Sequence, residues 1–147
     1  MDSKKGLVEV RVAAMDFLAR REHSLRELRT KLERRFPAEQ VEEALQTLAA
    51  EGLQSDTRFA EAFVRQRSQR GYGPLRVRQE LRQRGISDEL LNAAMDSVEV
   101  NWLETLAGVL ERKYGDTPAS DLKEKARRTR FLLYRGFSGE QIRELLD

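Results

Sequence analysis

RQRSQRGYGPLRVRQELRQR, residues 65–84, holds seven arginines against one acid, Glu80. At its centre, Gly71-Tyr72-Gly73-Pro74 ends one helical pattern and begins another. Glycine adopts backbone angles that other residues avoid, and proline suits a first helical turn. The stretch therefore predicts a basic helix end, a tight turn that carries an aromatic side chain, and a second basic helix.

The arginines of this stretch favour a binding surface. Arginine presents a planar fork of five donors that matches phosphate and carboxylate, so seven on two short helices suit an extended anion. Tyr72 either stacks on a base or a partner side chain, or packs the turn. The alternative is a solvated helix pair with ordinary ion pairs, but Glu80 alone balances few of these charges. The candidate binding residues are Arg65, Arg67, Arg70, Tyr72, Arg76, Arg78, Arg82 and Arg84.

A period near fifty residues runs through the whole chain. Leu32, Leu81 and Leu132 occupy corresponding positions, which recur after 49 and then 51 residues. Three amphipathic helices fit in each period. We expect repeat one over about residues 7–53, repeat two over about 54–99 and repeat three over about 100–147 of a single domain.

Capping signals mark several of the expected helix starts. Ser24 and Glu27 have the spacing of a capping box, as do Ser138 and Gln141. We expect Ser55 or Asp56 to cap the first helix of repeat two. The middle helix of repeat three is expected to begin after Pro118 or Ser120.

The repeats predict an all-α fold. A unit of three short helices buries its apolar stripe partly against its neighbour, so stacking gives a quasi-linear molecule. No segment combines strict alternation with β-branched enrichment, which argues against a sheet. We therefore expect an elongated, curved array of three tandem three-helix repeats, each similar to a helix-turn-helix unit.

Charge follows the repeat. The middle helix of each repeat is basic and the last helix is acidic, as in Arg20–Arg35 followed by Glu39–Glu51. Stacked in line, the repeats would present a basic stripe beside an acidic one. This segregation fits ion pairing between adjacent helices as well as it fits a function.

Composition excludes several classes of protein. The 147 residues carry a net charge of only +2, so overall charge does not indicate nucleic-acid binding, and the absence of cysteine excludes thiol chemistry. His23, the single histidine, is expected in a turn. No phosphate-binding glycine loop occurs. We therefore expect no enzyme, cofactor or metal. No apolar run approaches membrane-spanning length and no secretory signal is present, which predicts a cytosolic protein.

Several short motifs, in one order, resemble the RecX family of regulators of the bacterial RecA recombinase. The resemblance covers about residues 10–95, and beyond about residue 100 it rests on length and helical pattern alone. The motifs are Arg21-Glu22-His23-Ser24, Glu51-Gly52-Leu53, Arg58-Phe59-Ala60-Glu61 and Gly71-Tyr72-Gly73-Pro74.

The resemblance implies a non-enzymatic, cytoplasmic negative modulator of RecA in DNA repair and the SOS response. Such a protein binds RecA–DNA filaments, in the filament groove, and blocks their extension or promotes their disassembly. Strand exchange, ATP hydrolysis and co-protease activity are then inhibited. The resemblance carries Arg65, Arg67 and residues 71–74 over only as a family motif with a binding role.

The implied partners are the RecA filament and single- and double-stranded DNA, which the protein contacts directly or through RecA. We expect a monomer, because each repeat covers its neighbour's apolar face. One alternative is a stand-alone, sequence-independent DNA-binding protein, since a three-helix unit with a basic second helix can imitate a helix-turn-helix reader. A structural helical adaptor whose charges are only surface is the third possibility.

Overall fold

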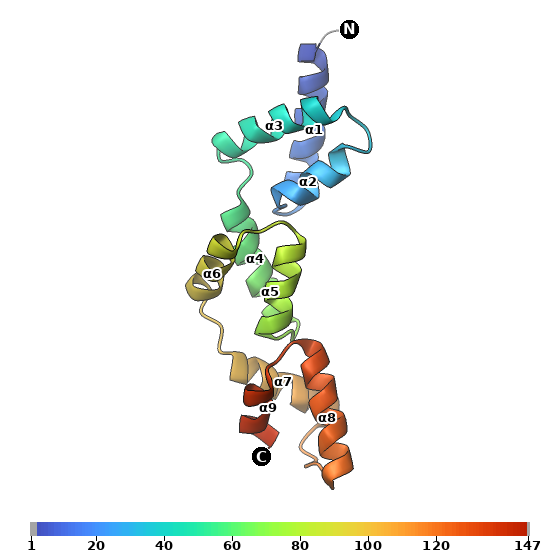
Figure 1. Cartoon of the computed structure of the whole chain (residues 1–147), viewed down its shortest axis with the longest axis vertical. Coiled ribbons are helices and arrows are strands. Elements are labelled where there is room, and N and C mark those ends of the chain that lie inside the picture. The colour runs from blue at the N-terminus through green and yellow to red at the C-terminus, as the bar shows by residue number, and fades with distance from the viewer. Residues whose placement is uncertain (1–2, 147) are drawn as a thin grey trace.

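The chain is a stack of helices. The computed structural model describes residues 3–146, and in that range it contains nine α-helices and no strand. The helices are α1 (Ser3–Arg20), α2 (Leu25–Leu32), α3 (Ala38–Ala50), α4 (Asp56–Gln69), α5 (Pro74–Gln83), α6 (Asp88–Ser97), α7 (Trp102–Tyr114), α8 (Leu122–Arg135) and α9 (Gly139–Leu146). In Figure 1, α1–α3 form one end of an elongated molecule, α4–α6 its middle and α7–α9 its other end.

The helices group in threes, which confirms the predicted all-α fold of tandem three-helix units. Repeat one comprises α1–α3, repeat two α4–α6 and repeat three α7–α9. Each repeat has its own apolar core, centred on residues such as Leu45 in the first, Phe59 in the second and Phe137 in the third. Leu32, Leu81 and Leu132, which define the sequence period, are at most 1% exposed. Truncating such a leucine to alanine costs about 2–5 kcal/mol.

Local capping explains why the helices begin where they do. The Ser24 hydroxyl accepts from the Glu27 N–H at 3.1 Å, and the Glu27 carboxylate accepts from the Ser24 N–H at 3.1 Å, so the expected capping box is present. Ser138 and Gln141 make the same reciprocal pair. Ser55, rather than Asp56, caps α4.

The middle helix of repeat three, α8, begins after Ser120, the second of the two expected boundaries. Asp121 is the N-cap of α8, and its carboxylate accepts from the Glu124 N–H at 2.8 Å. Pro118 and Ser120 lie in the connection before it. The sequence analysis did not name Asp121, although aspartate is as good an N-cap as serine. Arg128, which is buried, donates to the Thr117 carbonyl at 2.8 Å and ties this connection to α8.

Candidate binding surface

Helix α5 begins where helix α8 ends, and main-chain hydrogen bonds join the two. The N–H of Gly73 donates to the carbonyl of Arg135 at 2.8 Å, and the N–H of Leu75 donates to that of Gly136 at 3.0 Å. Gly73 is the N-cap of α5 and has no side chain that could accept hydrogen bonds from the N–H groups of the first turn. The following repeat therefore supplies the acceptors that a helix start needs. The positive N-terminal end of the α5 dipole thereby meets the negative C-terminal end of the α8 dipole.

We call this contact between the start of α5 and the end of α8 the joint between repeats two and three. Glycine is needed on both sides of it. A methyl group at residue 73 would overlap the main chain of Gly136 and Phe137, and one at residue 136 would overlap the Cβ of Arg76. Gly136 also has a φ of +102°, which favours glycine. The Gly71-Tyr72-Gly73-Pro74 turn, predicted as part of the binding surface, is thus a joint between repeats two and three.

A second joint connects repeats one and two. Arg26, in the first turn of α2, donates to the Gln83 carbonyl at the end of α5 over 3.4 Å. A methyl group added at Gly85 would lie only 2.8 Å from the Cβ of Arg26, so the two helix ends approach closely here. The Asp56 carboxylate accepts from the N–H of Leu25 at 2.9 Å, so the first helix of repeat two also caps α2.

The two joints set the basic middle helices end to end. In Figure 1, α8 and α5 follow one another along the right-hand side of the molecule, and α2 continues beyond α5. We use the name basic stripe for six exposed cations that lie on these helices or, for Arg34, directly after α2. Three of these, Arg34, Lys123 and Arg130, have no ion pair with any other described residue. The basic stripe comprises Arg26, Arg34, Arg82, Lys123, Arg127 and Arg130.

Tyr72 packs the joint between repeats two and three. Its ring centre lies 5.2 Å from the guanidinium carbon of Arg67, 4.4 Å from that of Arg76 and 4.8 Å from that of Arg135. Arg67 also pairs with Glu80 at 3.2 Å. These cation–π contacts come from both repeats, so three predicted binding residues, Arg67, Tyr72 and Arg76, contribute to the joint.

Arg84 holds the other joint. Its guanidinium lies 4.8 Å from the centre of the Phe63 ring, and its Nε lies 3.7 Å from the Glu27 carboxylate. Burial raises the pKa of Glu27. The hydrogen bonds from Arg21 and the Ser24 N–H, with the charge of Arg21, outweigh that effect and hold the pKa below its ordinary value. Glu27 is thus an ionised carboxylate that links Arg21 and Arg84.

Arg78 and Arg82 lie on the outer face of α5, where they contact the acidic helix α6. Arg78 donates to the Asn92 side chain at 2.8 Å, and Arg82 donates to Asp88 at 3.1 Å. The Arg82–Asp88 ion pair is exposed on both sides. Exposed pairs of this kind contribute little to stability, so Arg82 is able to exchange Asp88 for another anion.

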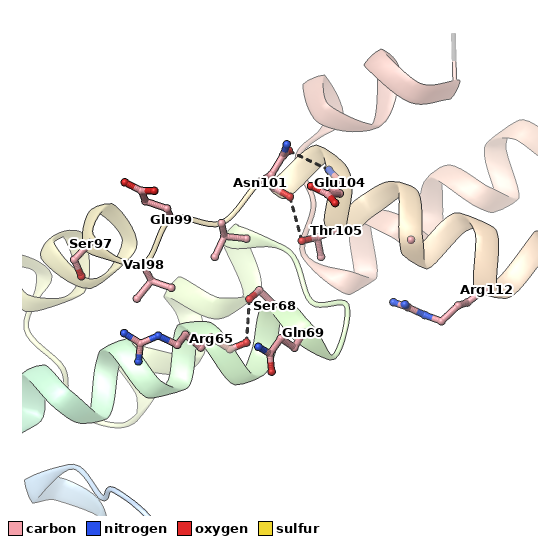
Figure 2. A pocket seen from close by; sticks show the side chains of 12 residues that line it. Arg65, Ser68, Gln69, Ser97, Val98, Glu99, Asn101, Glu104, Thr105 and Arg112 are labelled. Carbon is pink, nitrogen blue, oxygen red and sulfur yellow. Dashed lines mark hydrogen bonds between the residues drawn. The ribbon is translucent and has the colours of Figure 1, made fainter.

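Arg65 and Arg70 are exposed and pair with no acid among the described residues. Arg65 lines a cleft of about 600 Å³ between repeats two and three, and Arg112 of α7 lies on its opposite side (Figure 2). Glu99 and Glu104 line the same cleft, so its charged groups balance. The eight predicted residues therefore do not share one surface: some are built into joints and others are open to solvent.

The prediction of site residues was confined to repeat two and left out exposed cations of the same kind in the other repeats. Arg34 follows α2, and Lys123 and Arg130 lie on α8. The repeated basic middle helix was the signal that pointed to them. Their place on a common stripe depends on the joints, which the period does not describe.

Among residues 3–146 there is no cluster of three or more histidine, aspartate and glutamate side chains placed to hold a metal ion. In the same range, every helix is too short or too polar to cross a lipid bilayer.

Models of known families match all three repeats. The model of the first three-helix domain of RecX matches residues 11–48, that of the second matches residues 55–95 and that of the third matches residues 99–146. Repeat three, where the motif resemblance was weakest, is thus matched as well.

Related proteins and structures agree with these matches. The chain is 48% identical over 141 residues to "Regulatory protein RecX" of Pseudomonas entomophila, covering 95% of this chain and 91% of that protein. It is 47% identical over 135 residues to the protein of the same name from Halorhodospira halophila, covering 91% and 84%. A crystal structure of RecX from Lactobacillus salivarius superposes with a TM-score of 0.74 at 24% identity, covering 96% of this chain and 94% of that one. The chain belongs to the RecX family.

Proposed function

We propose that this protein is a regulator of RecA that binds RecA filaments on DNA and limits their activity. Its relatives are named regulatory proteins, which supports a regulatory rather than a catalytic role. The observation that carries the proposal is the end-to-end order of α2, α5 and α8, with the basic stripe exposed along it. An elongated array of cations suits a polymer better than it suits a small ligand.

The proposed mode of action follows from shape. A filament repeats the same subunit along a helical groove, and an elongated protein lying in that groove contacts several subunits at once. Such a bridge blocks the addition of further subunits or favours their release. Strand exchange, DNA-dependent ATP hydrolysis and co-protease activity, which need the extended filament, then decline together. The protein acts as a cytoplasmic monomer in this proposal.

ATP hydrolysis by preformed RecA filaments on single-stranded DNA tests the proposal. The protein is added at far below one molecule per RecA subunit, so that simple occupation of every subunit is impossible. We expect hydrolysis to fall well beyond the fraction of subunits occupied. Unchanged hydrolysis over this range, with the added protein shown to be folded by circular dichroism, would refute filament regulation.

Stand-alone DNA binding is the second candidate, and the free cations of the basic stripe favour it. Phosphate contacts release counterions, so the affinity for bare DNA would fall steeply with salt and would not depend on sequence. Tight binding to bare DNA, together with no effect on RecA, would favour this candidate over filament regulation.

A further inference from the structure

A groove with both apolar and polar lining residues interrupts the basic stripe at the joint between repeats two and three. It has a volume of about 410 Å³ and lies between α5 and the last turn of α8. Three of its lining side chains are apolar or aromatic and strongly exposed: Leu75 at 54%, Leu133 at 48% and Tyr134 at 74%. Solvent-exposed apolar side chains that cluster along a groove mark interaction sites more often than scattered ones do.

The fold does not require apolar residues at these positions. Leu81 and Leu132 are corresponding buried residues, so Leu133 and Tyr134 correspond to Arg82 and Gln83 of repeat two. By the same correspondence, through Leu32 and Leu81, Leu75 takes the place of Arg26 in repeat one. The joint between repeats one and two therefore has two arginines and a glutamine at these positions. The joint between repeats two and three has two leucines and a tyrosine.

Cations surround the groove. Arg76 donates to the Tyr134 carbonyl at 3.3 Å and lies 5.2 Å from the centre of the Tyr134 ring. Arg130, one turn before Tyr134 on α8, is exposed and has no ion pair with a described residue. Glu80, the acid that lines the groove, lies 3.2 Å from Arg67 and 4.0 Å from Arg76, so two arginines share this one carboxylate. Together with Arg130, this leaves an excess of positive charge around the groove.

We propose that this groove receives an apolar side chain from an acidic protein segment. The aliphatic side chains of Leu75 and Leu133 suit a hydrocarbon side chain, and the excess of positive charge from Arg76 and Arg130 complements acids next to it. A nucleobase would use the Tyr134 ring but would leave Leu75 and Leu133 without a matching surface. The inference rests on the proposed function, because it assigns the groove to the protein of the recombinase filament rather than to its DNA.

A transplant of residues between the joints tests the inference. The variant Leu75→Arg, Leu133→Arg, Tyr134→Gln carries the residues that the other joint already uses, so we expect it to fold. We expect it to bind RecA filaments on single-stranded DNA at least about tenfold more weakly, a loss typical of anchor residues. Its added positive charge would instead strengthen a contact made through phosphates.

A matched control carries Val8→Arg and Val12→Arg, which replace exposed apolar residues of α1, outside both the groove and the basic stripe, and add the same charge. We expect it to bind filaments as the wild type does. Binding of the transplant variant to bare single-stranded DNA is measured beside it and is expected to be unchanged or tighter.

The remaining outcomes separate the possibilities. If the wild type binds filaments and the transplant variant binds as well or better, the groove inference is wrong and the proposed function stands. Equal weakening on bare DNA would assign the groove to a nucleobase and overturn the inference. A wild-type dimer that the transplant variant converts to a monomer would assign it to a second copy, which overturns it too. A wild type that does not bind filaments refutes the proposed function and the inference with it.

Discussion

The N–H of Gly73 donates to the carbonyl oxygen of Arg135 at 2.8 Å, so the first turn of α5 is capped by the last turn of α8. These residues belong to different repeats and are far apart in sequence. The bond depends on a close approach of two main chains, since any side chain at residue 73 would overlap residues 136 and 137. The end-to-end order of the basic helices rests on this contact.

Gly73→Ala is expected to lower the free energy of unfolding by about 1–3 kcal/mol, the usual cost of forcing extra atoms into a packed site. Urea unfolding followed by circular dichroism measures it. Gly108→Ala is the matched control. A methyl group at residue 108 meets only the end of the Arg112 side chain, at 3.6 Å or more. Alanine is the better helix former, so a gain of about 0.5–1 kcal/mol is expected there. Equal effects of the two substitutions would contradict the role of Gly73.

Tyr72 is predicted to stabilise the joint through its ring. Tyr72→Phe retains the ring between Arg67, Arg76 and Arg135 and is expected to change the free energy of unfolding by less than about 0.5 kcal/mol. Tyr72→Leu removes the cation–π contacts and is expected to cost about 1–3 kcal/mol. Thermal unfolding of the two variants makes the comparison, and a tolerated leucine would argue against the cation–π account.

Arg82, in the last turn of α5, and Arg84, the C-cap of that helix, are predicted to have different effects on stability. Arg84 contacts Phe63 and Glu27, whereas Arg82 forms an exposed pair with Asp88. Arg84→Met is expected to cost about 1–2 kcal/mol through lost cation–π and charge-assisted contacts. Arg82→Met should stay within about 0.5 kcal/mol. Urea midpoints of the two variants test this, and a reversed order would show that the joint does not depend on Arg84.

The sequence predicted the repeats better than it predicted the roles of the arginines. Leu32, Leu81 and Leu132 recur because each repeat needs the same buried contact, and the period is therefore visible without a structure. Arginine roles depend on partners that are distant in sequence. Within residues 65–84 only Glu80 is an acid, yet Arg84 meets Glu27 and Arg76 meets the Tyr134 carbonyl. Arg67, Arg76 and Arg84 are thus partly structural, which local charge counting did not anticipate.

His23 is predicted to make stability depend on pH. It is buried, its Nδ1 lies 3.0 Å from the Arg21 carbonyl, and its Nε2 lies 3.0 Å from the Lys31 ammonium. Burial lowers its pKa, and so do the charges of Arg21 and Lys31. The Arg21 carbonyl and Glu27 act in the opposite direction but leave the pKa below its ordinary value. A charged imidazole is therefore disfavoured in the folded protein.

The sign of the effect follows from proton binding. Below about pH 6.5 the unfolded chain takes up a proton at His23 that the folded protein resists, so stability falls as the pH is lowered. The variant His23→Gln has no titrating group at this position. It is expected to lose less stability than the wild type between about pH 7.5 and about pH 5, a range that brackets the ordinary histidine pKa. Glu27, whose pKa is lowered from an already acidic value, stays ionised over this window. Parallel pH profiles of the two proteins would contradict the prediction.

The central claim is that the basic stripe contacts the RecA filament. One exposed arginine from each repeat is removed in Arg34→Ala, Arg82→Ala, Arg130→Ala, and the control Arg20→Ala, Arg112→Ala, Arg143→Ala removes the same charge from α1, α7 and α9.

The decisive measurement is the concentration of each variant that halves ATP hydrolysis by preformed RecA filaments on single-stranded DNA. The stripe variant is predicted to need at least about tenfold more protein than the wild type, as expected when several charged contacts are lost. The control should match the wild type. If both variants weaken equally, total charge rather than the end-to-end stripe governs binding, and the account is contradicted.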